Sequence, residues 1–225
     1  MGSVLASKIQ NDAAGILMDR SLNRFGDYYL GWINDAQVML AAIKPDASVG
    51  VRTKELVEGV YQTISSDAHA IIRPIRNMGI DGLTPGPRID TVDYDHFTNN
   101  NPDWMDATAS ATVEVIMIDE RNDLGFFCYP PQPEIPGQIQ IVEAIVPATI
   151  AAIENAITIN DIHEPHMLQY VLFRGNSVST SEISKSAAMN AWNMFVTGLG
   201  RKDLVDKVIS ANTARKKLQG GQDAS

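Results

Sequence analysis

Apolar residues near the start of the chain recur at the spacing of an amphipathic helix. A helix is predicted over residues 4–18, with Ser3 as its cap. Its apolar face is formed by Leu5, Ile9, Ala13, Ile16 and Leu17. A second helix is predicted with Asp27 as N-cap and Lys44 as its end, because the residue before a proline is pushed out of helical geometry. A link this short predicts that the two helices pack together.

The last third of the chain shows the same helical spacing. Pro165 stands in the first turn of a helix whose apolar positions are Leu168, Val171, Leu172 and Gly175. The cap of the next helix is expected at Ser179, Thr180 or Ser181. The packing face of that helix is expected at Ile183, Ala187, Ala191 and Phe195. A last helix is predicted over residues 204–218, before a flexible tail at 219–225.

The middle of the chain has the alternation and β-branched residues typical of strands. Strands are predicted over residues 57–64, 69–76, 113–118, 126–129 and 138–146. The third and fourth are expected to form a β-hairpin closed by Pro130 and Pro131, with the fifth as their neighbour in one sheet. Residues 90–100 are predicted to form a short helix.

Together these elements predict an α+β fold. The N- and C-terminal helices are expected to form a bundle, and the middle of the chain a β-rich insertion that is either a sheet or a small sandwich. We expect residues 1–50 and 160–218 to form the helical domain and residues 51–159 to form the insertion. A length of 225 residues suits one sizeable domain or two small ones.

Charge is distributed unevenly along the chain. The net charge of −9 argues against sequence-independent binding to nucleic acid, which needs a basic face. Residues 201–225 nevertheless hold six basic residues against three acidic ones, so the rest of the chain carries −12. The six are Arg201, Lys202, Lys207, Arg215, Lys216 and Lys217. Such a segment is typical of a tail that docks on an acidic partner, and equally of a solvated helix end.

Membrane, secretory and disulfide-rich classes find no support. No apolar run reaches the roughly 18 residues of a membrane-spanning helix, and the first residues lack the basic start and apolar stretch of a secretory signal. The single cysteine, Cys128, excludes an intramolecular disulfide and fits a protein made in a reducing cytoplasm. Its place in an aromatic strand predicts a buried small side chain.

Residues with catalytic or metal-binding chemistry are sparse. His163 and His166 invite a metal assignment, with Glu164 as an oxygen ligand. Pro165 places them at a helix start, where their spacing is not fixed, so a helix entry with polar caps is the favoured interpretation. Three carboxylates cluster in the hairpin loop, where charged side chains are usually exposed to solvent: Asp119, Glu120 and Asp123. We predict no catalytic residue, cofactor or metal, since the phosphate-loop and nucleophile motifs are missing.

Three aromatic residues open the second helix: Tyr28, Tyr29 and Trp32. They either pack the helices together or anchor a subunit interface, where Tyr and Trp are enriched. The core role is favoured for Trp32, and the interface role is kept as a hypothesis for Tyr28 and Tyr29.

A series of short phrases runs along nearly the whole chain. They are YLGWINDAQ (29–37), IKPDA (43–47), RPIRNMG (73–79), NPDW (101–104), DER (119–121), FCYPP (127–131), LQYVLFR (168–174) and Trp192-Asn193. In this order and spacing they resemble the head-to-tail connector proteins of short-tailed phages, of the adaptor or tail-tubular type.

The resemblance implies a structural virion protein and not an enzyme. It implies a ring, usually dodecameric, between the portal protein and the tail nozzle or tube, at the head–tail junction of the virion. Packaged DNA would pass through this ring without sequence-specific binding, and no membrane is involved. C-terminal segments of such adaptors commonly reach the portal, so the six basic residues from Arg201 to Lys217 are predicted to dock there.

Other functions stay open at this point. One is a different head-completion protein, such as a stopper, or a tail-tube protein. Two come from different classes: a small metal-dependent hydrolase using His163 and His166, and a monomeric binding module.

Overall fold

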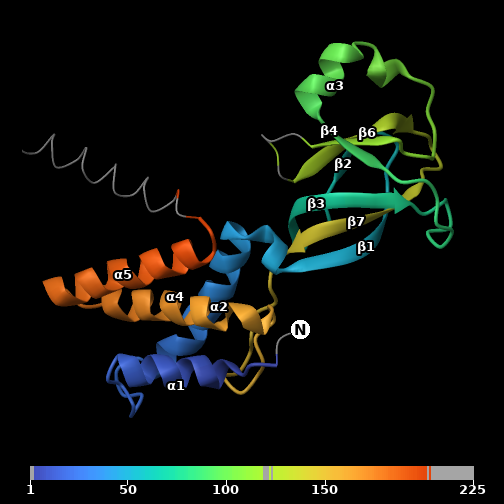
Figure 1. Cartoon of the computed structure of the whole chain (residues 1–225). Coiled ribbons are helices and arrows are strands. Elements are labelled where there is room, and N and C mark those ends of the chain that lie inside the picture. Colours follow the sequence, from blue (N-terminus) through green and yellow to red (C-terminus); the bar gives the residue numbers. More distant parts are fainter. Residues whose placement is uncertain (1–2, 119–121, 123, 202, 204–225) are drawn as a thin grey trace, which may run out of the picture. The chain divides into compact units, whose positions relative to one another are not determined.

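Figure 1 shows the computed structural model of the chain, in which residues 3–118, 122, 124–201 and 203 are described. The chain divides into two compact units, Met1–Lys44 with Pro147–Ser225, and Pro45–Val146. Helices make up the first, which we call the helical unit, and strands dominate the second, the β unit. The α+β fold predicted from the sequence is confirmed.

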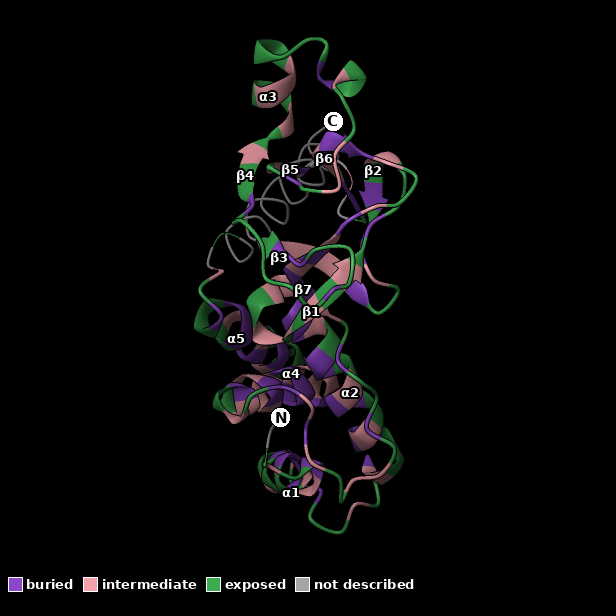
Figure 2. Ribbon diagram, turned by 90° about the vertical axis from the view of Figure 1, so that its right-hand side faces the viewer, coloured by how far each residue is buried: buried purple, intermediate pink, exposed green. Residues whose placement is uncertain are grey.

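The helical unit is built around α4. Its described helices are α1 (Ala6–Ile16), α2 (Gly26–Ile43), α4 (Glu164–Ser177) and α5 (Glu182–Gly198), with the 3-10 turn η3 (Asp161–His163) before α4. α4 packs against α1, α2 and α5, and the buried residues between these helices are purple in Figure 2. Fully buried side chains come from all four helices: Ile9, Ile33, Leu40, Val171 and Phe195. Burial of each stabilises the fold by about 1.5–3 kcal/mol.

The start of α1 differs from the prediction, since Ser3 is not its cap. The Ser3 hydroxyl and backbone N–H donate to the carboxylate of Asp161, and these bonds lower the pKa of Asp161. The first two N–H groups of α1 donate to the carbonyl oxygens of Asn155 and Ile153. The returning segment therefore satisfies donors that every helix leaves open at its N-terminus.

Two further predictions about helix α2 have different outcomes. Phe25 and not Asp27 is the N-cap, because the helix begins at Gly26 and Asp27 falls within the first turn. A negative charge there still favours the positive end of the helix dipole. The predicted end before Pro45 is confirmed, since α2 stops at Ile43.

The start of α5 is as predicted, and its packing face is confirmed at Ala191 and Phe195 but not at Ile183. Ser181 accepts a hydrogen bond of 3.2 Å from the N–H of Ser184 and caps the helix. Ile183 is 85% exposed and lies outside the packing face. The buried positions are Ala188, Ala191, Phe195 and Val196. The helix predicted at 204–218 lies outside the described residues.

The β unit contains two sheets. One has the order β1-β7-β3, formed by β1 (Val49–Glu55), β7 (Gln138–Ile145) and β3 (Ala68–Asn77). The other has the order β2-β6-β5-β4, formed by β2 (Gly59–Thr63), β6 (Gly125–Gln132), β5 (Val115–Ile118) and β4 (Asp90–Asp93). Short helical pieces complete the unit: η1 (Pro45–Ala47), α3 (Tyr94–Asn100) and η2 (Trp104–Asp106).

The predicted hairpin is confirmed, but its surroundings differ from the prediction. β5 and β6 pair antiparallel, with Ile116 opposite Cys128. β6 continues through Pro130 and Pro131 to Gln132, and β7 belongs to the other sheet. The helix predicted at 90–100 is confirmed only from Tyr94 onwards, because residues 90–93 form β4, parallel to β5.

A shared core lies between the two sheets. It contains Leu56, Ile89, Val113, Ile116, Phe126, Cys128, Ile139 and Ile141. Phe126 and Cys128 come from the four-stranded sheet and Ile139 and Ile141 from the three-stranded one. The sheets therefore pack face to face as a small sandwich, one of the two forms expected from the sequence.

Within the described part of the chain, no helix is long and apolar enough to cross a membrane.

Candidate functional site

Irregular pairing of β3 with β7 decides which way two arginines face. The register shifts at three places along β3, the last between Pro74 and Arg76. Arg73 therefore pairs with Val142 and Arg76 with Gln140, while Pro74 pairs with the core residue Ile141. Paired residues share a face of the sheet, so both arginines lie on the side away from the core.

The outer face of the three-stranded sheet is exposed along β1 and β3, whereas Val142 and Ala144 of the central strand β7 are buried on it. β1 alternates along its length, and Val51 and Thr53 pair with Val142 and Gln140. Val51 is 60% exposed, and Val49 is exposed as well. We call the set Val49, Val51, Thr53, Arg73 and Arg76 the sheet surface. It places apolar side chains beside two cations, the combination found at protein interfaces.

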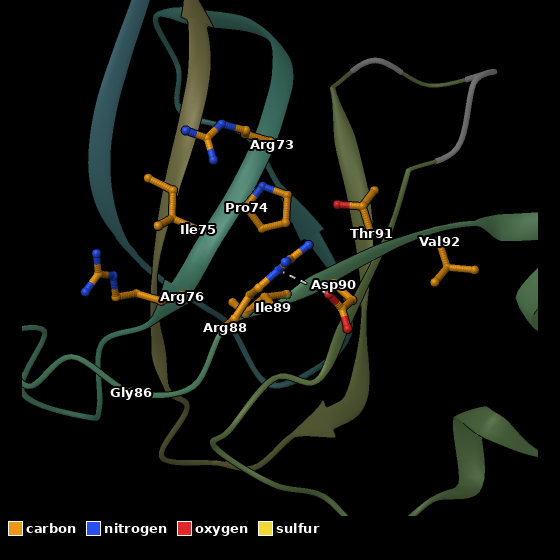
Figure 3. Close-up of a pocket in the computed structure, with 10 residues that line it drawn as sticks. All are labelled: Arg73, Pro74, Ile75, Arg76, Gly86, Arg88, Ile89, Asp90, Thr91 and Val92. Carbon is orange, nitrogen blue, oxygen red and sulfur yellow. Dashed lines mark ion pairs between the residues drawn. The ribbon is translucent and has the colours of Figure 1, made fainter.

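Beside the sheet surface, an open hollow of about 910 Å³ lies between β3 and the residues that enter β4 (Figure 3). Arg88 stands at its rim, with its Nε 3.3 Å from Oδ1 of Asp90. Arg76 and Arg88 occupy opposite positions of an isolated antiparallel bridge, and Figure 3 shows their guanidinium groups turned away from each other. Like charges at paired positions repel, which accounts for this divergence.

The arginines of β3 are cations in an otherwise acidic unit. Arg73 and Arg76 are exposed, and neither forms an ion pair with a described residue. The β unit holds six basic residues against 16 acidic ones, a net charge of −10, whereas the helical unit holds 12 against 11. Half of the basic residues of the β unit therefore gather around β3, with Asp90 as their only ion-pair partner among the described residues.

Of the six basic residues predicted to dock on the portal, only Arg201 is described. Its guanidinium binds both carboxylate oxygens of Asp203, at 2.9 and 3.0 Å, and donates to the carbonyl oxygen of Ile43 at the end of α2. Hydrogen bonding to Asp203 raises the pKa of Arg201. Arg201 thus links α2 to the segment after α5, and the other five residues lie outside the described part: Lys202, Lys207, Arg215, Lys216 and Lys217.

The structure separates the two tyrosines predicted for a subunit interface. Tyr29 is fully buried beside Phe25 and Trp32, so it is a core residue of the helical unit and is not available to a partner. Tyr28 is 59% exposed and stacks on Trp32 at 5.8 Å between ring centroids. Trp32 is 6% exposed, in keeping with a core role. The interface hypothesis therefore remains for Tyr28 alone.

The histidine pair forms no recognisable metal site in the described chain. The rings of His163 and His166 lie 5.8 Å apart between centroids, at the entry to α4. No group of three or more potential ligands is found among residues 3–118, 122, 124–201 and 203. Glu164 is engaged by Lys8 of α1 in an ion pair between helices. The carboxylates Asp119, Glu120 and Asp123 lie outside the described residues.

Cys128 is fully buried in the sandwich core, as predicted. Burial raises the pKa of its thiol to about 11, so almost none of it is thiolate at neutral pH. A nucleophilic cysteine needs the opposite shift, which argues for a packing role.

Sequence reasoning did not identify the sheet surface. Arg73 and Arg76 are three positions apart, and a regular strand would place them on opposite faces. Only the bulge at Ile75 brings them to the same side, and its formation depends on pairing with residues more than sixty positions away. The available signal was the presence of two arginines around a proline in an otherwise apolar strand.

Comparison with protein families and with curated proteins identifies the family of the chain. No curated protein matches the chain. The model of the SU10 adaptor protein family matches residues 5–216, which include most of the helical unit and the whole β unit. Since this match covers nearly all of the 225 residues, the chain belongs to the SU10 adaptor protein family, a family of phage structural proteins.

Proposed function

We propose that the chain is a head-to-tail adaptor subunit, which assembles into a ring between the portal and the tail and extends the DNA channel. The match to the SU10 adaptor family over residues 5–216 carries this proposal. The proposed place is the head–tail junction of the virion, reached after synthesis in the host cytoplasm. The role is structural and not catalytic.

The charge of the β unit supports a channel role. With a net charge of −10, this unit repels the phosphate backbone, whose binding requires clustered Lys and Arg. A wall of the same sign as DNA lets the duplex pass without adhering. Sequence-specific contacts have no place in such a role.

The basic residues beyond Arg201 are proposed to grip the portal. They are Lys202, Lys207, Arg215, Lys216 and Lys217. A chain that ends after Asp203 keeps the contacts of Arg201 with Ile43 and Asp203, so its helical unit stays intact. We expect this truncated chain to be folded but to lose attachment to the portal. Unchanged attachment would refute the docking role.

Ring formation is tested by mixing the purified full-length chain with portal rings of the same phage. Negative-stain images should show a closed ring of the chain on the portal, and crosslinking with mass measurement should give the number of copies. Portal rings alone are the control. Absence of any added ring would contradict the proposed function. Co-purification with a tail-tube protein and no portal binding would instead favour the tail-tube alternative.

A further inference from the structure

The outer face of the three-stranded sheet exposes side chains of β1 and β3 in the combination found at protein interfaces. Its exposed valines, Val49 and Val51, lie beside two cations that no described residue neutralises. The β3 edge of this sheet is poorly suited to strand pairing, because Pro74 lacks an N–H and the strand is bulged three times. The partner is therefore expected to contact side chains of the face and not the backbone of this edge.

A complementary surface lies on the opposite layer of the same unit. Trp104 is buried and contacts Phe127 of β6, with 6.0 Å between ring centroids. Phe127 alternates with the core residues Phe126 and Cys128, so η2 covers the outer face of the four-stranded sheet. Burial of Trp104 holds η2 in place on that face.

The residues around Trp104 point outward and are acidic and apolar. Asp103 and Asp106 are three positions apart on a 3-10 turn, a spacing that puts side chains on the same side. Both are exposed, and neither forms an ion pair with a described residue. Met105 between them is 50% exposed. This group, the η2 surface, thus pairs two carboxylates with one apolar side chain, where the sheet surface pairs two guanidinium groups with valines.

We infer that the sheet surface of one subunit binds the η2 surface of the neighbouring copy of this chain. Asp103 and Asp106 would pair with Arg73 and Arg76, and Met105 would cover Val51. Because the two surfaces lie on opposite layers of the sandwich, the contact is head-to-tail, and such contacts generate rings when the rotation closes. This inference rests on the proposed ring.

DNA is the less favoured occupant of the sheet surface. Figure 3 shows the guanidinium group of Arg88 turned away from those of Arg73 and Arg76, so the three do not converge on one phosphate. The surrounding unit, at −10, also lowers the local concentration of any nucleic acid. Carboxylates on a neighbouring protein surface match the spread of these charges.

Charge reversal on each side tests the contact during assembly of full-length chains on portal rings. Arg73→Glu/Arg76→Glu and Asp103→Arg/Asp106→Arg should each reduce the fraction of chains in rings by about tenfold or more, because like charges then face each other. A chain carrying all four changes should regain assembly, since every interface again joins opposite charges. Glu58→Arg/Glu134→Arg, a reversal at two exposed positions of the same unit, should assemble normally.

The outcomes separate this interface from the proposed function. If either double variant assembles like the wild type, or the fourfold variant stays defective with an unchanged circular dichroism spectrum, this interface is wrong and the ring stands. If the wild-type chain forms no ring, the proposed function and this interface both fall. If the wild-type chain slows the migration of a DNA duplex in a native gel at low salt and Arg73→Glu/Arg76→Glu does not, the sheet surface binds DNA and the inference is overturned.

Proximity is measured independently by disulfide formation. A mixture of Val51→Cys and Met105→Cys chains should form crosslinked dimers within rings, whereas either chain alone should form few. The buried Cys128 does not interfere, since its thiol is inaccessible. Val57→Cys, at another exposed position of the β unit, is the control partner for Met105→Cys. Equal crosslinking of the control pair would argue against a specific contact.

Discussion

At three places in the described part of the chain, an amide side chain pairs with both backbone groups of one loop residue. In each, an Asn or Gln side chain accepts from the N–H and donates to the C=O of one loop residue, as a neighbouring strand would. The pairs are Asn34 with Ile150, Gln62 with Val57, and Asn77 with Val113. Buried backbone groups must be paired, and these amides pair them where no strand is available.

The amide of Asn77 also donates to the carbonyl oxygen of Pro87, in addition to its pair with Val113. Asn77→Asp preserves the shape but removes both donors and turns a carboxylate towards two carbonyl oxygens. We expect a loss of about 2–4 kcal/mol in the free energy of unfolding, measured in urea at neutral pH. Asn11→Asp, at an exposed position of α1, should change it by less than about 0.5 kcal/mol. A similar loss in both variants would contradict the buried amide role.

Tyr29 couples the stability of the helical unit to alkaline pH. Burial, followed by the nearby Asp19, raises the pKa of its hydroxyl to about 12. Above the unfolded value of about 10, the unfolded chain releases this proton while the folded chain keeps it, so stability falls as pH rises. The buried thiol of Cys128 acts in the same direction.

We therefore expect the free energy of unfolding to decrease between about pH 10 and 12, and to decrease less steeply in Tyr29→Phe. Chemical denaturation at a series of pH values measures both slopes. Tyr28→Phe should keep the wild-type slope, because Tyr28 is exposed. Identical slopes in all three chains would show that Tyr29 ionises as freely in the folded chain as in the unfolded one.

At the scale of elements, α5 depends on its cap. Ser181 is the residue whose side chain satisfies the N–H of Ser184, and no acidic residue precedes it within the serine-rich link. Ser181→Ala should destabilise the helical unit by about 1 kcal/mol, read from urea unfolding. Ser186→Ala, at an exposed position inside α5, should be neutral or slightly stabilising, since alanine has the higher helix propensity. An effect of equal size at both positions would show that Ser181 contributes no capping.

Local signals in the sequence were sufficient for most elements but not for their partners. The periodicity of α2, the stop before Pro45 and the cap at Ser181 are encoded within a few residues, and these predictions are confirmed. The sheet that contains β7 is decided by pairing with β1 and β3, far away in the sequence. Ser3 was predicted as a helix cap, but its hydroxyl donates to Asp161 instead, and this partner comes from a distant segment that local signals do not reveal.

The candidate site was less predictable than the fold for the same reason. Asp103 and Asp106 share a side only because residues 104–106 adopt a 3-10 turn, and that turn is held by the contact of Trp104 with Phe127. Arg73 and Arg76 share a side only because of the bulge in β3. Neither geometry has a local signature, whereas the acidic charge of the β unit is visible in the sequence itself.

At the scale of the whole molecule, the β unit is an insertion whose two ends meet. Val49 pairs with Ala144, and the N–H of Ile145 donates to the carbonyl oxygen of Ser48 at 2.7 Å. The chain therefore enters and leaves the unit through adjacent strands of one sheet. A closed core between its two sheets belongs to this unit alone.

Residues 45–146 are accordingly predicted to fold as an isolated fragment. Its one tryptophan, Trp104, is 4% exposed, so its fluorescence should report a single cooperative transition in urea. Ile116→Asp in the same fragment places an unpaired carboxylate in the core and should abolish the transition. A fragment with solvent-exposed Trp104 in buffer would show that the sandwich needs the helical unit to fold. A folded fragment would also permit the η2 surface and the sheet surface to be tested in solution without the portal.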